Sequence, residues 1–192
     1  MGRSPARRPI NRVRIIGGKW RGRKLAVASA AIRPTPDRAR VTVFNWLAAD
    51  LPGARILDLF AGTGVLGFEA LSRGAAHAVL VDDDASACRL LRRHRDELEA
   101  AADVHRGNGV RWLRRRREDE RWDVVFLDPP FGTPLLDAAL PEAAARLAAD
   151  GAIYVEADAD FDPGRIEQVT GLMTTRQSHA GASHFRLLRR HQ

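Results

Sequence analysis

The chain has 192 residues, of which 45% are hydrophobic and 29% charged, and this is typical of a globular domain that can bury a core. No apolar run approaches the ~20 residues that cross a bilayer, the start lacks the apolar segment of a secretory signal, and the single cysteine excludes an internal disulfide. We therefore expect a cytoplasmic protein, although an Arg-rich, acid-free start also fits a mitochondrial transit peptide. The net charge of +7 favours a polyanionic partner.

The first fifty residues are the most basic part of the chain, since ten Lys and Arg residues precede the first acidic residue, Asp37. We expect residues 1–12 to form a flexible basic arm. Strand-like runs at 13–16 and 24–27 flank a glycine-rich basic segment, which predicts a β-hairpin with a basic tip. A helix is predicted to follow to about residue 47, capped by Thr35 or Asp37. Residues 13–50 are thus predicted as an extension that contacts nucleic acid.

From residue 51 onward the sequence predicts a separate catalytic domain, 51–192, in which strands alternate with helices. Strands are predicted at 56–60, 78–81, from 104, at 122–127 and at 152–155. Helices are predicted at 65–72, 85–99, 109–116 and 135–147, the last with a break at Pro141. Residues 165–174 and 184–188 are expected to close the sheet as an antiparallel pair. This alternation predicts an α/β, doubly wound, mostly parallel sheet with ligands at the carboxyl ends of its strands.

A glycine-rich turn, Gly62-x-Gly64-x-x-Gly67, follows the first of these strands and is typical of nucleotide-cofactor sites. Asp82 ends the next strand, where a carboxylate can accept both ribose hydroxyls. The same pattern fits NAD, but Asp58 would face an amino group, which S-adenosylmethionine has and NAD lacks. A strand-end aspartate that caps the turn is the structural alternative. Asn108, after the third strand, fits either an adenine contact or a helix cap.

The run Asp128-Pro129-Pro130-Phe131 follows a buried strand. The two prolines remove backbone donors and leave carbonyl acceptors, Asp128 is acceptor-only when ionised, and Phe131 can stack on a ring. Such a group suits an exocyclic amine on a base that is flipped out or single-stranded. The alternative is an ordinary turn after a strand.

Other chemistries find little support in the sequence. The six histidines are scattered without a helical ligand pair, so no metal site is predicted. The Gly-x-Ser-x-Gly signature of serine hydrolases is absent.

With these residues assembled, the chain resembles the RsmD-type methyltransferases, which modify guanine N2 in small-subunit ribosomal RNA. The resemblance spans nearly the whole chain and is carried by residues 14–25, 33–47, 57–74 and 128–131. The first two segments make it specific, because the last two are shared by amino-methyltransferases in general. Val41 departs from the family, which usually has an acidic residue there.

The resemblance implies a Rossmann-like class I S-adenosylmethionine-dependent fold with a seven-stranded sheet and an N-terminal β-hairpin. It implies that Asp128, Pro129, Pro130 and Phe131 hold the guanine amine. The expected cofactor site consists of Asp58, Phe60, Ala61, Gly62, Thr63, Gly64, Asp82, Asp83, Asn108 and Gly109. The expected RNA contacts are Lys19, Arg21, Arg23, Lys24, Arg38 and Arg40.

The leading hypothesis is therefore transfer of a methyl group from S-adenosylmethionine to N2 of one guanine in 16S ribosomal RNA, on an assembling small subunit, by a monomer. The same chemistry on adenine N6 or cytosine N4 of DNA is the alternative enzyme reading. A non-catalytic RNA-binding assembly factor is the alternative from another class, and an NAD-dependent dehydrogenase comes last. The sequence does not specify which guanine is modified.

Overall fold

The computed structural model describes residues 12–27, 37–159, 161 and 164–191. Its centre is a seven-stranded sheet in the order β5-β4-β3-β6-β7-β9-β8, in which β3 to β7 are parallel and β9 is antiparallel to both β7 and β8. This is the predicted mostly parallel sheet. The strands are β3 Arg55–Asp58, β4 His77–Asp82, β5 Ala102–Arg106, β6 Trp122–Leu127, β7 Leu147–Ala157, β8 Leu172–Ala180 and β9 Ser183–Arg190.

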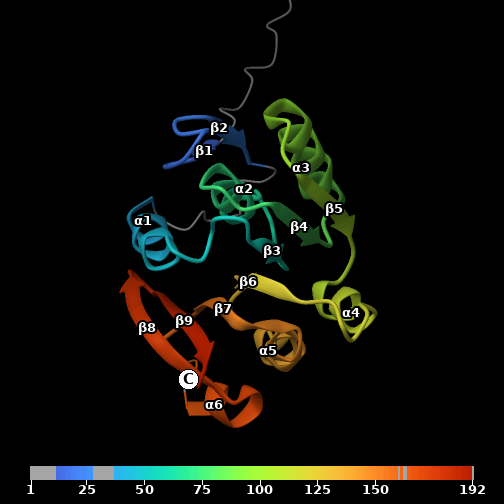
Figure 1. Ribbon diagram of the computed structural model, residues 1–192. Coiled ribbons are helices and arrows are strands. Elements are labelled where there is room, and N and C mark those ends of the chain that lie inside the picture. The colour runs from blue at the N-terminus through green and yellow to red at the C-terminus, as the bar shows by residue number, and fades with distance from the viewer. Residues whose placement is uncertain (1–11, 28–36, 160, 162–163, 192) are drawn as a thin grey trace, which may run out of the picture.

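Helices cover both faces of the sheet and make three layers (Figure 1). One face packs against α1 Asp37–Trp46, α2 Val65–Ser72 and α3 Ala85–Leu98, and the other against α4 Gly109–Arg114, α5 Leu135–Ala145 and α6 Gly164–Thr170. Because the central strands are buried on both faces, they are near-continuous apolar runs such as Val124–Leu127, which has no exposed surface.

The chain order places a topological switch point between β3 and β6. From β3 the chain moves outward through β4 to β5, then returns to add β6 on the other side of β3. In a doubly wound sheet the crevice at such a point, outside the carboxyl ends of the strands, is where ligands bind. The fold therefore directs attention to the loops that follow β3 and β6.

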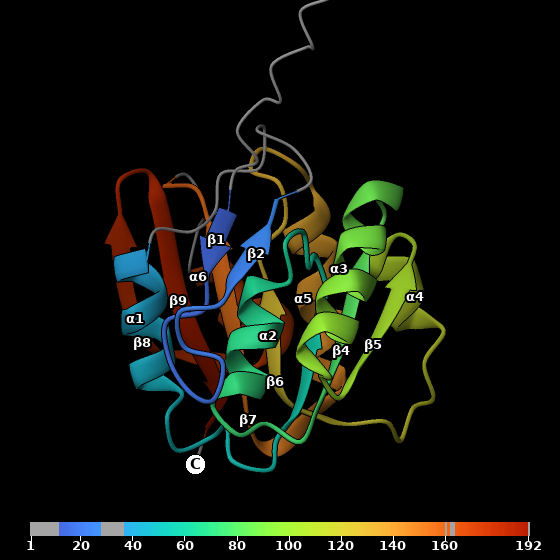
Figure 2. The ribbon, with the colours of Figure 1, turned by 90° about the horizontal axis from the view of Figure 1, so that it is seen from above.

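The N-terminal extension begins with a two-stranded hairpin, which is antiparallel as predicted. Its strands are β1 Arg12–Arg14 and β2 Lys24–Ala26. It lies over α2 (Figure 2), and Val13, Ile15 and Leu25 join the core on that face of the sheet. The hairpin tip lies at the C-terminal end of α2, where Ser72 accepts hydrogen bonds from the backbone N–H of Lys19 (2.8 Å) and of Trp20 (2.9 Å).

Two predicted elements are wrong. Helix α5 does not break at Pro141, because the buried residues on both sides of it, including Leu140 and Ala143, keep the helix packed on the sheet. Residues 165–174 are not one strand: they form most of α6 and the start of β8. Gly171, with φ 67°, ends a helix there and lets the chain turn into β8.

The predicted arm at 1–12 lies outside the described residues except for Arg12, which begins β1. The proposed cap Thr35 is also outside them. No helix among the described residues is long and apolar enough to cross a membrane.

Candidate active site

A cavity of about 770 Å³ opens at the carboxyl ends of the strands, at the switch point. Its walls come from the loops after β3, β4, β5 and β6 and from the turn between β8 and β9. Of the predicted cofactor residues, nine line it: Asp58, Phe60, Ala61, Gly62, Thr63, Asp82, Asp83, Asn108 and Gly109. All four residues of the run 128–131 line the same cavity.

The glycine turn begins the cofactor side of this cavity. Gly62 and Gly64 have φ angles of 51° and 74°, a region that L residues with side chains rarely adopt. A Cβ at Gly64 would lie 2.5 Å from Leu91 and 2.6 Å from Phe68. Gly64, absent from the cavity wall, therefore serves the turn and the packing of α2, whose N-terminal end it precedes.

Three consecutive aspartates begin at Asp82, the last residue of β4, and two of them make different contacts. Asp82 accepts hydrogen bonds from the backbone N–H of Gly62 (2.7 Å) and of Asp84 (2.9 Å), which fixes its carboxylate beside the glycine turn. Burial raises the pKa of Asp82 above its ordinary value, and nearby Asp83 and Asp84 add to this effect. Asp84 caps α3 by accepting from Ser86 N–H and Ala87 N–H. Asp82 thus offers an oriented acceptor for hydroxyl groups.

Asp58 is the most deeply buried carboxyl group of the cavity wall, with 2% of its surface exposed. Its Oδ2 accepts from the backbone N–H of Gly67 at 3.1 Å. Burial raises the pKa of Asp58 to about 7, an effect that the negative charge of Asp82 increases and the Gly67 hydrogen bond opposes. A ligand ammonium group would offset this cost of ionisation.

Asn108 is a helix cap, which was one of its two predicted roles. Its side-chain oxygen accepts the backbone N–H of Arg111 at 2.9 Å and so caps α4. It still lines the cavity, next to Gly109. A Cβ at Gly109 would lie 2.6 Å from the carbonyl oxygen of Leu59, so only glycine lets the loops after β3 and β5 approach this closely.

The run 128–131 lines the cavity at the end of β6, the strand next to β3. Asp128 follows β6 directly, Pro129 is buried, and the Phe131 ring is 46% exposed at the mouth. The hydroxyl of Thr133 donates to the carbonyl oxygen of Pro130 at 2.7 Å and holds the turn. An exposed aromatic ring beside a carboxylate at a cavity mouth is an arrangement that can stack on a planar group.

The remaining wall was not predicted from the sequence. Glu156 near the end of β7, and Ala180 to Ser183 where β8 turns into β9, also line the cavity. The only local signal was a glutamate near the end of a predicted apolar strand. The turn could not be found because it depends on how β8 and β9 pair.

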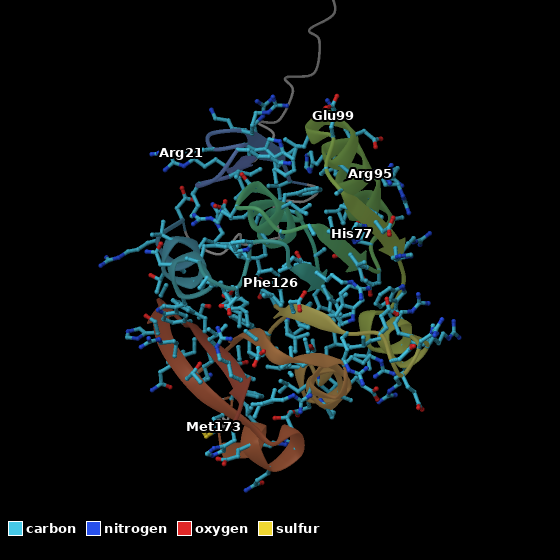
Figure 3. The ribbon with its side chains drawn as sticks, viewed as in Figure 1. Arg21, His77, Arg95, Glu99, Phe126 and Met173 are labelled. Carbon is cyan, nitrogen blue, oxygen red and sulfur yellow. The ribbon has the colours of Figure 1, made fainter. Side chains whose placement is uncertain are left out.

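The predicted RNA contacts fall into two groups. Lys19, Arg21, Arg23, Lys24 and Arg38 are exposed, and Figure 3 shows Arg21 extending outward from the hairpin, away from the core residue Phe126. Arg40 does not belong with them: its side chain is completely buried, bonded to Asp37 and near Glu69. The prediction for Arg40 is wrong, since it holds the extension together and cannot reach a phosphate.

The cavity fits S-adenosylmethionine. It joins oriented carboxylates for hydroxyl and ammonium donors (Asp82 and Asp58) to apolar wall residues Leu59 and Leu66, in a volume that can hold a nucleotide-sized ligand. Fold and site together define a Rossmann-like, S-adenosylmethionine-dependent methyltransferase.

Comparisons with known proteins show which family of methyltransferases the chain belongs to. The family model "Conserved hypothetical protein 95" matches residues 13–189. Ribosomal RNA small subunit methyltransferase D of Escherichia coli K12 is 44% identical over 152 residues, which cover 77% of this chain and 76% of that protein. The Haemophilus influenzae protein of the same name is 40% identical over 154 residues, covering 77% and 80%. The chain belongs to this family, the RsmD-type methyltransferases.

Solved structures agree with this family assignment. The "putative methyltransferase yhhF" of E. coli is 38% identical and superposes with a TM-score of 0.82 over 95% of this chain and 100% of that one. A Thermus thermophilus 16S rRNA N2 G1207 methyltransferase, solved with AdoMet and guanosine, shares the fold with a TM-score of 0.76 at 18% identity, over 95% of this chain and 50% of that one.

Proposed function

We propose that this protein transfers a methyl group from S-adenosylmethionine to the exocyclic N2 of one guanine in small-subunit ribosomal RNA. The observation that carries the proposal is that the Asp128–Phe131 run and the glycine turn line one and the same cavity, at the ends of the adjacent strands β6 and β3. The names of the relatives support a ribosomal RNA substrate.

The chain's own residues would orient the amine. The Asp128 carboxylate and the carbonyl groups of the proline turn accept the two N–H bonds of the guanine amine, which directs the nitrogen lone pair across the cavity. Phe131 stacks on the base and limits its tilt. When bound, S-adenosylmethionine supplies an already activated methyl group, so positioning is the main requirement. As the N–C bond forms and the C–S bond breaks, the amine loses one proton toward Asp128.

Cofactor binding is assigned to the glycine turn and to the loops after β4 and β5. Asp58 would pair with the ammonium group and Asp82 with the ribose hydroxyls. Phe60, Ala61, Thr63, Asp83 and Gly109 would surround the remainder, with the Asn108 loop at the adenine.

Residues 13–50 are proposed as the RNA-contacting extension and 51–192 as the catalytic domain, acting as a monomer in the cytoplasm. Five exposed basic residues of the extension are the proposed contacts: Lys19, Arg21, Arg23, Lys24 and Arg38. The target guanine would leave its helix or be single-stranded, because the amine of a paired guanine is not accessible to such a cavity.

The test is methylation of small-subunit particles and of naked small-subunit RNA with labelled S-adenosylmethionine, followed by nucleoside analysis. The proposal predicts label in N2-methylguanosine. Label in N6-methyladenine or N4-methylcytosine of DNA would instead establish the alternative enzyme. RNA binding without any methyl transfer would indicate an assembly factor. Calorimetry with S-adenosylmethionine and with NAD provides the first check, since only the former is expected to bind.

A further inference from the structure

Glu156 stands beside Asp128 in the sheet. In the parallel pair β6–β7, Phe126 is level with Tyr154 and Leu127 with Val155, so the next residues, Asp128 and Glu156, are level with each other. Because side chains alternate between faces along a strand, both follow the face of Phe126 and Tyr154. Both line the cavity. Two carboxylates therefore lie next to each other on the wall of the cavity.

The Glu156 carboxylate is held in a fixed orientation. The Tyr154 hydroxyl donates to its Oε2 at 2.8 Å, and the Ser183 hydroxyl in the β8–β9 turn donates to its Oε1. Tyr154 is itself fixed in a row of aromatic rings, 5.9 Å from Phe126 and 6.5 Å from Phe185 between ring centroids. Only 5% of Glu156 is exposed.

Tyr154 is affected by the charges of both carboxylates. Burial, with the negative charges of Glu156 and Asp128, raises the pKa of Tyr154 well above its ordinary value, so its hydroxyl stays a donor. A carboxylate has about four lone-pair sites and can accept from more than one donor at a time. Glu156 is thus an oriented acceptor on the cavity wall.

Guanine has the matching edge. Its N1–H and its N2 amine are adjacent donors, whereas adenine has an acceptor at N1. Resting on the function proposed above, we propose that Glu156 selects guanine by accepting N1–H while Asp128 accepts the neighbouring amine. Adenine would place its N1 lone pair against the Glu156 carboxylate, which is repulsive.

A purely structural role for Glu156 is the competing account, since the same hydrogen bonds tie β7 to the β8–β9 turn. The two accounts differ in substrate preference. Loss of a structural link lowers activity on every substrate alike, whereas loss of an N1–H acceptor changes the ratio between substrates that have and lack N1–H.

The experiment uses the full chain and the guanine that the wild-type protein is first mapped to methylate. That guanine is replaced by 2-aminopurine, which keeps the amine but has no hydrogen on N1. The wild type should prefer guanine, and Glu156→Gln, whose amide can donate to N1 of 2-aminopurine, should lower the guanine to 2-aminopurine ratio of kcat/KM by about 10- to 100-fold. Tyr154→Phe, which removes one of the hydrogen bonds that orient the carboxylate, should lower the ratio less.

Glu167→Gln on α6, exposed and not part of the cavity wall, is the matched control and should leave the ratio unchanged. Calorimetry with S-adenosylmethionine and thermal melting identify variants that fail to fold; should Glu156→Gln unfold, Tyr154→Phe decides. Equal losses on both purines would overturn the inference and leave the proposed function standing. A wild-type protein that methylates no guanine N2 would instead reject the proposed function itself.

Discussion

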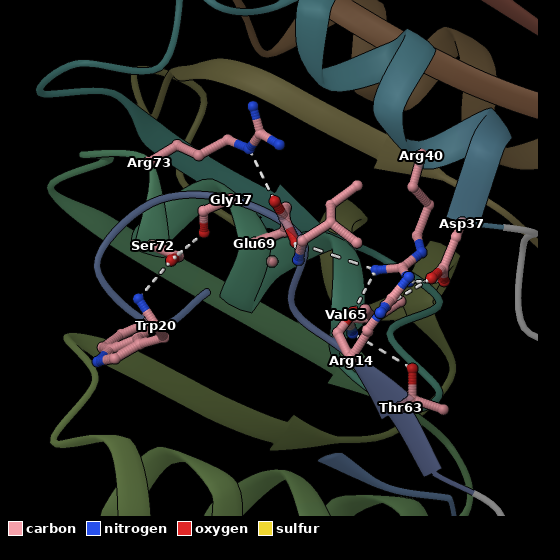
Figure 4. A network of polar contacts seen from close by, with 12 residues as sticks. Arg14, Gly17, Trp20, Asp37, Arg40, Thr63, Val65, Glu69, Ser72 and Arg73 are labelled. Carbon is pink, nitrogen blue, oxygen red and sulfur yellow. Dashed lines mark hydrogen bonds and ion pairs between the residues drawn. The ribbon is translucent and has the colours of Figure 1, made fainter. Parts of the chain in front are cut away.

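The guanidinium group of Arg40 lies 3.9 Å from the carboxylate of Glu69, Nη1 to Oε2, and both side chains are fully buried. Arg40 also donates to the backbone carbonyl of Arg14 at 2.9 Å, while Glu69 accepts from the backbone N–H of Ile16 (2.7 Å) and from Arg73 (2.7 Å). Figure 4 shows this network. The pair thus joins α1, the hairpin and α2, so the N-terminal extension is fixed to the helix that follows the cofactor turn.

Arg40→Met should destabilise the protein. The variant keeps the Arg73–Glu69 pair but leaves the backbone carbonyl of Arg14 without its buried donor, and one unsatisfied buried acceptor costs about 1–3 kcal/mol. Urea unfolding followed by circular dichroism measures the loss. Arg38→Met, two residues away on the exposed face of α1, is the control and should stay within about 0.5 kcal/mol of wild type. Similar small effects for both variants would mean that the extension is held by its apolar contacts alone.

The burial of Arg40 could have been predicted from helical spacing. Arg40, Val43, Phe44 and Leu47 recur three and four residues apart, which places Arg40 on the face that packs against the core. The sequence interpretation grouped it with Arg38 because both are basic, and charge alone says nothing about burial.

For the fold and the cavity, prediction succeeded where the signal is local. The β3 strand with its glycine turn and the β6 strand with Asp128-Pro129-Pro130-Phe131 are each encoded within a dozen residues. The wall formed by Glu156 and Ser183 arises from the pairing of β7, β8 and β9. That pairing joins residues far apart in the chain, so no local pattern could place them beside Asp128.

Because Asp58 is buried, its ionisation should lower the free energy of unfolding as the pH rises. Its pKa in the folded protein is about 7, against ~3.9 in an unfolded chain. Between these values the folded state holds the proton that the unfolded state releases. The contribution is therefore complete below pH ~4 and is lost as the pH rises to about 7.

Asp58→Asn isolates this contribution, because the amide has no proton to lose. From pH 4 to 8 the wild type should lose up to about 4 kcal/mol of stability relative to the variant, measured by urea unfolding at each pH. Asp119→Asn, at an exposed loop position, should change the pH profile little. A constant difference between wild type and Asp58→Asn across this range would show that Asp58 is ionised throughout.

Asp128→Ala should slow methyl transfer strongly without loss of the cofactor. The role proposed for Asp128 is to hold the amine and not the cofactor, so affinity for S-adenosylmethionine should stay within a few fold of wild type by calorimetry. Single-turnover methylation should slow by about 10²- to 10⁴-fold. Asp128→Asn, which keeps one acceptor oxygen, should lose less. Loss of folding or of cofactor binding in both variants would point to a structural role.

Arg38 should matter more for RNA than Arg21. Ile16 bonds to Glu69 in the middle of α2, and Trp20 bonds to Ser72 at its C-terminal end, so the hairpin extends along α2 away from the cavity. Arg21 therefore lies near the end of α2 that is farther from the cavity. Asp37, which begins α1, pairs instead with Arg14 in β1, nearer the cavity end. An exposed charge at Arg38 is therefore better placed for phosphates that flank a guanine held in the cavity.

Arg38→Glu should lower kcat/KM on small-subunit RNA about tenfold and reduce the slope of log affinity against log salt by about 0.7–0.9, the value for one phosphate contact. Arg21→Glu should have a smaller effect on both quantities. Arg165→Glu on α6 reverses the same charge on the opposite face of the sheet and should change neither. A larger loss for Arg21→Glu would mean that the RNA extends along α2 to the hairpin tip, and that the tip carries most of the binding.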